Sequence, residues 1–323
     1  MSGECLIRVS EVSVEYAARG GGWRRSVVRA LSDVSLAVSA GEALGIVGES
    51  GCGKSTLARV ILGLVAPVRG QVEWFGHPVD RLTRRKRRGL RARMQVVFQD
   101  PLASLNPLMT VGDIVAEPLE VHRGGMDGRA RRAAVAEMLE RVGLSADMAH
   151  RYPHEFSGGQ CQRIGIARAM IGAPDFVVCD EAVSALDVSV QAQIVNLLAH
   201  FKREMRLSIL FVSHNLAVVR HLCDRVLVLY LGHMMEACAA ADLLEVAVHP
   251  YTRSLVAALP VADPLVQPGR LAEVPSGDLP SPLAVPAGCP FHTRCPLADA
   301  RCGRERPQWR ERGPGHWVAC HHV

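Results

Sequence analysis

The most informative segment of this sequence is GESGCGKST, from Gly48 to Thr56. It follows the apolar segment ALGIVG (43–48) and precedes the apolar segment LARVILGLV (57–65), which is the strand-then-helix context that the pattern GxxxxGK[ST] requires. In this pattern glycines let backbone N–H groups close around phosphate oxygens, and the following helix points its positive N-terminal end at them. The sequence therefore predicts a loop that binds the phosphates of a nucleoside triphosphate.

Two side chains of this loop are expected to contact the nucleotide and its metal ion directly. Lys54 would place a compact positive charge on the β- and γ-phosphates, and the Ser55 hydroxyl would complete a Mg²⁺ shell. Among the 37 basic residues only Lys54, Lys86 and Lys202 are lysines. Because lysine and arginine are not interchangeable at phosphate sites, a lysine here is informative. The loop residues expected to surround the nucleotide are Gly48, Ser50, Gly51, Cys52, Gly53, Lys54, Ser55 and Thr56.

The composition describes a folded protein of one large or two ordinary domains, with 323 residues, 49% hydrophobic and 21% charged. No run approaches about 18 apolar residues, and the start MSGECLIRVSEV lacks a basic and then apolar leader. We therefore expect the chain neither to span a membrane nor to be secreted. Ten cysteines without such a leader indicate a reducing compartment, and the six scattered ones are expected to be small buried residues.

Short apolar strands alternate with helical stretches from Leu6 to Leu259, which predicts a mostly parallel sheet covered by helices, an α/β fold. Three strands stand out, at ALGIVG (43–48), DFVVCDE (175–181) and SILFVSH (208–214). Each ends in, or leads directly into, polar residues, and ligands gather beyond the carboxyl ends of strands in such sheets. The basic run RLTRRKRRGLRAR (81–93) has no interleaved aromatics, so we interpret it as a solvated, partly helical surface segment rather than a nucleic-acid site.

Two carboxylates end the second of these strands. Asp180 is suited to hold Mg²⁺ through water, and Glu181 is suited to polarise the attacking water. Together with the phosphate loop, this pair predicts hydrolysis of the bound nucleotide.

The segment FSGGQ, Phe156 to Gln160, opens the stretch CQRIGIARAM, whose apolar spacing predicts a helix. Through FSGGQ the sequence resembles the ATP-binding cassette (ABC) ATPases, whose signature is of the LSGGQ type. Other family motifs match in order, with Gln99 in VFQDP as the Q-loop glutamine, Ser184 to Asp187 as the D-loop and His214 as the switch histidine. The resemblance covers nearly all of residues 6–259. It implies a P-loop nucleotide-binding domain at 1–259, with a helical subdomain at about 100–173.

The resemblance also implies site residues. The signature residues Ser157, Gly158, Gly159 and Gln160 would contact a nucleotide held by the opposite subunit, so two cassettes arranged head to tail would enclose two nucleotides. Tyr16 would stack on adenine, and Mg²⁺ would be held by Ser55, Gln99 and Asp180. The residues expected to act in hydrolysis are Lys54, Gln99, Glu181 and His214. Ala182, Cys161 and Asn215 depart from the common ABC pattern, and their effect on the rate is left open.

Sharper likeness comes from QDPLASLNP (99–107), RYPHEFSGGQ (151–160), HPYTRSLVAALP (249–260) and LPSPLAVPAGC (279–289). These segments resemble the ATPase subunits of oligopeptide, dipeptide and nickel importers. The FSGGQ form of the signature motif resembles that of the second (F-type) of the two ATPases in such systems. The resemblance implies an ATPase at the cytoplasmic face of the inner membrane that works with two permease subunits, a paralogous ATPase and an extracytoplasmic solute-binding protein. The cargo stays open among dipeptide, longer peptide, glutathione and nickel or another metal chelate.

The C-terminal part differs from the rest of the chain in amino-acid composition. Eight prolines fall between Pro260 and Pro290, which predicts an extended linker at 260–288 before a small module at 289–323. That module has cysteines spaced C-x5-C-x6-C-x17-C, at Cys289, Cys295, Cys302 and Cys320. Four thiolates suit an iron–sulfur cluster or zinc, and a module without metal is the third possibility. The resemblance favours a [4Fe–4S] cluster.

Two protein classes other than importers are alternatives for this sequence. DNA-repair ABC ATPases also combine cassettes with cysteine–metal modules, but they place two cassettes in one chain, whereas this chain has one cassette and the importer-type extension. Copurification with membrane subunits rather than nucleic acid would discriminate between these classes. A pure interaction scaffold would require Lys54 and Glu181 to be dispensable.

Overall fold

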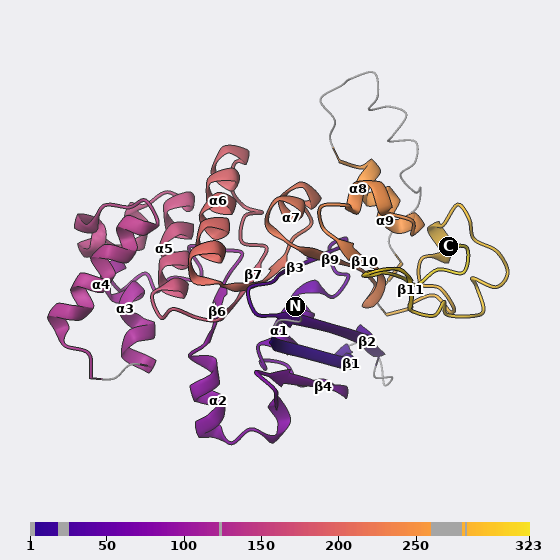
Figure 1. Cartoon of the computed structure of the whole chain (residues 1–323), viewed down its shortest axis with the longest axis horizontal. Coiled ribbons are helices and arrows are strands. Elements are labelled where there is room, and N and C mark those ends of the chain that lie inside the picture. Colours follow the sequence, from indigo (N-terminus) through magenta and orange to yellow (C-terminus); the bar gives the residue numbers. More distant parts are fainter. Residues whose placement is uncertain (1–3, 19–25, 123–124, 260–279, 282) are drawn as a thin grey trace. The chain divides into compact units, whose positions relative to one another are not determined.

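The computed structural model describes residues 4–18, 26–122, 125–259, 280–281 and 283–323 (Figure 1). These residues form two compact units, each assembled from several stretches of the chain. The first unit takes the described residues of Met1–Leu6, Val38–Ala43 and Trp74–Val212, and the second takes those of Ile7–Ala37, Leu44–Glu73 and Ser213–Val323. Almost all of the predicted linker lies outside the described residues. None of the helices in the described part of the chain has the length and hydrophobicity needed to cross a lipid bilayer.

The first unit combines parallel strands with a group of helices. Its elements in chain order are β5 (His77–Pro78), η1 (Val79–Arg81), α2 (Arg84–Arg91), β6 (Met94–Val97), α3 (Val111–His122), α4 (Gly128–Arg141), η2 (Ala146–His150), η3 (Pro153–Glu155), α5 (Gly158–Met170), β7 (Phe176–Asp180), α6 (Val188–Met205) and β8 (Ser208–Val212). Strand β7 runs parallel to β6 on one side and to β8 on the other, with Phe176 opposite both Met94 and Ser208. Every residue of β8 is buried, as expected for a parallel strand covered on both faces.

The helices α3, α4 and α5 of the first unit pack side by side (Figure 1). Their buried side chains include Ile114, Leu139 and Ile164. These helices lie inside the range of about 100–173 where a helical subdomain is expected. The basic run at 81–93 contains α2, which has no buried residue, so the interpretation as a partly helical surface segment is confirmed.

The second unit carries the phosphate loop and the C-terminal region. Its elements in chain order are β1 (Cys5–Ala18), β2 (Ser26–Ser39), β3 (Ala43–Val47), α1 (Lys54–Ile61), β4 (Arg69–Trp74), α7 (Leu216–Leu222), β9 (Arg225–Tyr230), β10 (His233–Ala239), α8 (Leu243–Val246), α9 (Pro250–Ala257), η4 (His292–Arg294), β11 (Arg310–Gly313) and β12 (His316–Val318), where β1, β2, β3 and β4 each have end residues in the first unit. The strand–loop–helix prediction around Gly48 is confirmed. Helix α1 ends at Ile61, earlier than the apolar stretch suggested, because Gly63 adopts a left-handed φ of 64°.

The C-terminal strands extend the sheet that presents the phosphate loop. Strand β3 is parallel to β9, β9 is antiparallel to β10, and β10 is antiparallel to β12, which closes a hairpin with β11. A buried carboxylate reinforces this arrangement. The Glu236 side chain is fully buried and accepts hydrogen bonds from the backbone N–H groups of Val248 (2.9 Å) and His249 (3.1 Å), and its Oε1 lies 2.7 Å from His316 Nε2. Residues of the cysteine-rich tail therefore belong to the same unit as the loop.

Candidate functional site

The loop between β3 and α1 requires glycine at two positions. Gly48 has a φ of 151°, and a Cβ there would lie 2.2 Å from the Leu229 carbonyl oxygen. Gly53 has a φ of 103°, and a Cβ there would lie 2.4 Å from the Ala30 carbonyl oxygen. Both obstacles are backbone atoms, so no side chain fits without moving the surrounding chain. Gly53 is also the N-cap of α1 and supplies no side-chain cap, which suits the first-turn amides of α1 to bind an anion.

Lys54 lies inside this loop and is only 4% exposed. Its Nζ donates to the carbonyl oxygens of Gly48 at 2.8 Å and Glu49 at 2.9 Å, and lies 3.8 Å from Cys52 Sγ. Carbonyl oxygens orient a buried ammonium but do not neutralise it, so the arrangement favours an incoming anion. Burial raises the pKa of the Cys52 thiol more than Lys54 lowers it. Cys52 is therefore a neutral thiol that packs within the loop.

Glu181 follows strand β7 and has a left-handed backbone, with a φ of 49°. A non-glycine residue in this conformation costs roughly 1 kcal/mol or more. Its N–H donates to the Val212 carbonyl at 3.0 Å, and its carbonyl accepts from the Ser184 hydroxyl at 3.0 Å. These bonds hold the strained turn, and strain of this kind is a common feature of functional sites. The preceding Cys179 is fully buried, and burial raises its pKa to about 12.

The signature residues form the N-terminus of α5. Ser157 is the N-cap, its Oγ accepting from Gln160 N at 3.4 Å while Gln160 Oε1 accepts from Ser157 N at 3.0 Å, a reciprocal capping box. Gly158 is exposed and Gly159 is half-buried. The end of α5 thus offers a hydroxyl and backbone amides at an accessible helix N-terminus, which suits an anion.

The other predicted site residues lie in both units. Gln99 of the first unit is exposed and follows β6. In the second unit Tyr16 lies on β1 and is 36% exposed, and His214 is exposed two residues beyond β8. The structure groups Gly48–Thr56, Tyr16 and His214 in one unit, and Gln99, Ser157–Gln160, Asp180 and Glu181 in the other.

The three departures from the common ABC pattern have local structural roles. Ala182 and Cys161 are buried, and the Cys161 thiol donates to the Pro153 carbonyl at 3.5 Å. Asn215 is the N-cap of α7, where its Oδ1 accepts from the backbone N–H groups of Ala217 at 3.0 Å and Val218 at 3.4 Å. An asparagine caps a helix as well as an aspartate does, so this departure leaves the local fold intact.

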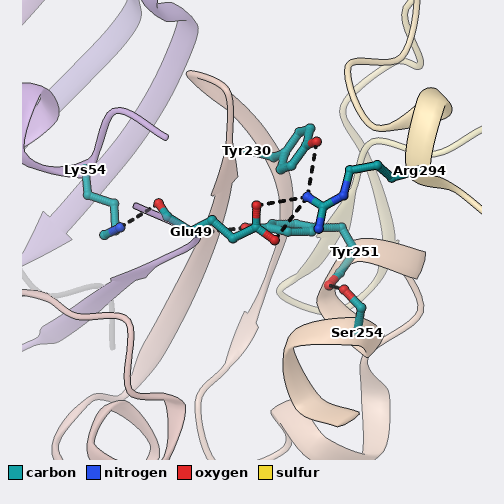
Figure 2. Close-up of polar contacts among 6 residues, drawn as sticks. All are labelled: Glu49, Lys54, Tyr230, Tyr251, Ser254 and Arg294. Atoms are coloured by element: carbon teal, nitrogen blue, oxygen red, sulfur yellow. Dashed lines mark hydrogen bonds and ion pairs between the residues drawn. The ribbon is translucent and has the colours of Figure 1, made fainter. Parts of the chain in front are cut away.

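The sequence did not predict that Arg294 and Tyr251 contact the phosphate loop. Arg294 Nη1 lies 2.9 and 3.1 Å from the two carboxylate oxygens of Glu49, and the Tyr251 hydroxyl accepts the Glu49 backbone N–H at 2.8 Å (Figure 2). Burial lowers the pKa of Arg294, but its hydrogen bonds to Glu49 and Tyr230 outweigh burial and raise the pKa above its ordinary value. The family-like segment HPYTRSLVAALP includes Tyr251, but its sequence does not indicate that Tyr251 contacts Glu49.

The four C-terminal cysteines lie in the same unit. Cys289, Cys302 and Cys320 are buried, and Cys295 is half-buried. Burial, with a smaller contribution from the other three cysteines, raises the pKa of Cys289 to about 11. The Cys289 N–H donates to the Cys302 carbonyl at 2.8 Å, a contact that needs Gly288, where a Cβ would lie 2.4 Å from that oxygen.

One of these cysteines, Cys302, belongs to a set of potential metal ligands that it forms with Asp299 and His322. Ligand atoms of Asp299, Cys302 and His322 lie within 4.8 Å of one another. Cys302 Sγ is 3.5 Å from His322 Nε2, and the Cys302 N–H donates to Asp299 Oδ1 at 2.8 Å. Thiol, imidazole and carboxylate groups at this spacing are the donor types that transition metals use.

Two family models match the chain. The model described as ABC transporter matches residues 31–184, and the model described as the C-terminal region of oligopeptide/dipeptide transporters matches residues 235–302. The second match begins inside β10, upstream of the cysteines, and includes three of the four.

Among curated relatives, the oligopeptide transport ATP-binding protein OppF of Haemophilus influenzae is 46% identical over 98% of this chain and 97% of its own length. OppF of Escherichia coli is 48% identical over 94% of this chain and 92% of its own. Among solved structures, a dimeric post-hydrolysis state of the ATP-binding cassette MJ0796 with ADP and Pi matches with a TM-score of 0.65 and 30% identity, covering 73% of this chain and 99% of that one. These neighbours confirm the α/β P-loop ATPase fold.

Proposed function

This chain belongs to the family of ABC transporter ATP-binding subunits of oligopeptide importers, and on that premise we propose how its residues divide the work of hydrolysis. It is an ATPase that powers peptide import across a membrane together with permease subunits. The observation that carries the assignment is the glycine loop with the buried Lys54 ammonium, which is shaped for phosphate. The loop and Lys54 bind the β- and γ-phosphates.

The proposed catalytic base is Glu181. Its carboxylate accepts a proton as water attacks the γ-phosphorus, the bond to the bridging oxygen breaks, and ADP leaves. His214 holds a γ-phosphate oxygen or positions that water. Ser55, Gln99 and Asp180 offer a hydroxyl, an amide and a carboxylate oxygen, a donor set that fits Mg²⁺, which when bound supplies charge neutralisation at the phosphates. Tyr16, part-exposed on β1, is available to stack on adenine.

We propose that the signature end of α5 acts on a nucleotide bound by a partner subunit. Its accessible amides support this assignment, and the matched cassette structure is a dimer. The partner is a paralogous ATPase, the pair is attached to the cytoplasmic face of the inner membrane through the permeases, and a solute-binding protein delivers the cargo. The proposed cargo is dipeptides or longer peptides.

Gly158→Ala is expected to fold normally but to lower ATP hydrolysis by the assembled importer by about 100-fold, the effect of a small misplacement of reacting groups. A Cβ at Gly158 would meet only Leu186 Cδ2 within 4 Å, at 3.9 Å, so the chain tolerates it, whereas it would protrude where the partner's phosphate binds. The measurement is phosphate release by the membrane complex, with melting temperature as a check on folding.

Gly165→Ala is the matched control for this variant. Gly165 lies further along the same helix, with nothing within 4 Å of an added Cβ, so Gly165→Ala should keep wild-type turnover. Wild-type turnover of Gly158→Ala would contradict the role proposed for the signature.

We propose that Cys289, Cys295, Cys302 and Cys320 bind a [4Fe–4S] cluster, with zinc as the alternative. Support comes from four cysteines in one unit, three of them buried, in a region of the fold whose regular structure is one short hairpin and one turn of 3-10 helix. Four thiolates are the ligand set of such a cluster, and metal binding supplies folding free energy to small modules. The group's proposed task here is structural.

Cys295→Ser is expected to remove the cluster. Anaerobically purified wild-type chain should be brown and contain about four irons, as a four-thiolate cluster requires, whereas the variant should be colourless with little iron. The measurements are iron and zinc content and the visible spectrum.

The control for the cysteine variant is Cys5→Ser, which changes a half-buried cysteine on β1 and should leave the metal content unchanged. One zinc per wild-type chain would replace the cluster by zinc, and the absence of any metal in anaerobically purified protein would contradict the metal proposal altogether.

A further inference from the structure

All the polar groups of Glu49 are held by named partners, and two of these partners come from C-terminal segments of the chain. The Glu49 N–H donates to the Tyr251 hydroxyl, its carboxylate pairs with Arg294, and its carbonyl oxygen accepts from Lys54 Nζ at 2.9 Å (Figure 2). Arg294 is separated from Glu49 by 245 positions in sequence. A residue of the phosphate loop is therefore fixed by residues beyond the ATPase motifs.

The contact between Arg294 and Glu49 is a packed one. The Arg294 side chain is 11% exposed and that of Glu49 is 29% exposed. Arg294 Nη1 also lies 3.4 Å from the Tyr230 hydroxyl, and the guanidinium carbon lies 5.9 Å from the centroid of the Phe291 ring. Fully exposed ion pairs contribute little, but a pair held between aromatic rings loses less freedom on forming and is less screened by salt.

The aromatic residues around Arg294 tie the two C-terminal segments together. Ring centroids of Tyr230 and Tyr251 are 4.7 Å apart, and Phe291 lies 5.3 Å from each of them. Ser254 Oγ donates to the Tyr251 carbonyl at 2.7 Å, which adds support within the buried α9 segment. Arg294 directly precedes Cys295, so the turn that carries the cysteine also carries the arginine.

We propose that Arg294 is a positioning residue that couples the cysteine-rich module to ATP binding, by neutralising Glu49 and holding the phosphate loop in its receptive shape. Without Arg294 the loop would keep an unpaired carboxylate near the triphosphate, and like charges at short range repel. The loop would also have to be ordered when ATP binds, which weakens affinity. The inference rests on the proposed assignment of residues 48–56 to phosphate binding.

Coupling of this kind is reciprocal. If the docked module favours ATP binding, then bound ATP must favour the docked module by the same factor. ATP should therefore slow backbone hydrogen exchange in segment 289–302 of the wild-type chain. This protection should disappear in Arg294→Ala, which gives a readout independent of hydrolysis.

The test measures the Kd for ATP of the full chain by calorimetry. Arg294→Ala should weaken binding on the order of tenfold, within the usual range of coupling between sites, and Arg294→Lys should recover part of this loss. In the assembled importer the KM for ATP should rise while kcat stays close to wild type. In a Glu49→Gln background, Arg294→Ala should have little further effect, because the charge that it neutralises is gone.

Arg301→Ala is the matched control. Arg301 lies in the same module and pairs with Glu305 at 2.9 Å on the surface, so its loss should leave ATP affinity unchanged. Unchanged affinity in Arg294→Ala, or an equal loss in the wild-type and Glu49→Gln backgrounds, would overturn the inference. Lys54→Ala distinguishes failure of the phosphate-loop assignment from failure of the role proposed for Arg294. If Lys54→Ala also binds ATP normally, the loop assignment itself is wrong, whereas weakened binding in Lys54→Ala alone removes only the role of Arg294.

Discussion

Replacing Glu181 by glutamine is expected to stop ATP turnover while ATP stays bound. Glutamine keeps the size of the side chain but cannot accept the proton of the attacking water, so the rate should fall by about 10²- to 10⁴-fold, the usual contribution of a general base. The Kd for ATP should change little, because phosphate binding is assigned to the loop and Lys54. Single-turnover phosphate release and retention of unhydrolysed ATP by the assembled importer measure the two effects.

Glu120→Gln is the control for this variant. Glu120 lies on α3, half-exposed, and pairs with Arg131 at 2.8 Å, so the same change of side chain there should leave turnover intact. Wild-type hydrolysis by the Glu181→Gln importer would show that another group is the base.

Lys54→Ala is expected to weaken ATP binding itself. Lys54 Nζ is buried and already oriented by the carbonyl oxygens of Gly48 and Glu49, so its charge acts on the phosphates without further ordering. Removing one partner of a buried charge pair costs about 2–5 kcal/mol, which corresponds to roughly 30- to 5,000-fold in Kd. Equilibrium titration with ATP checks the result.

Lys86→Ala provides the control for the lysine variant. Lys86 is exposed on α2, with its Nζ 3.5 Å from His77 Nδ1, so truncation there should not alter the Kd. Equal affinities of the Lys54→Ala and wild-type chains would remove the phosphate-binding role from the loop.

Much of the local structure could be predicted because its determinants are contiguous. The apolar runs at 43–48, 175–181 and 208–214 are strands β3, β7 and β8, each fully or almost fully buried. Parallel strands covered on both faces have this continuous apolar pattern, so short windows of sequence suffice to identify them. Five of the six scattered cysteines are buried, which confirms their interpretation as small core residues.

The backbone conformation of Glu181, the proposed catalytic base, could not be predicted from the sequence. Nothing in DFVVCDE indicates that Glu181 adopts a left-handed φ of 49°, since only glycine and asparagine adopt such angles readily. The turn is imposed by hydrogen bonds to Val212 and Ser184, and one of these partners lies on another strand. Conformations selected by such tertiary contacts override local preference.

Sequence patterns alone predicted the strand, loop and helix around Gly48, the signature helix and the carboxylates at the end of β7, because each depends on residues within a few positions of one another. The pairing of β12 with β10 and the contact between Arg294 and Glu49 could be seen only in the folded chain. These partners are far apart in the chain, and their pairing depends on the burial of Glu236 and on the packing of Tyr230, Tyr251 and Phe291, which no local pattern specifies.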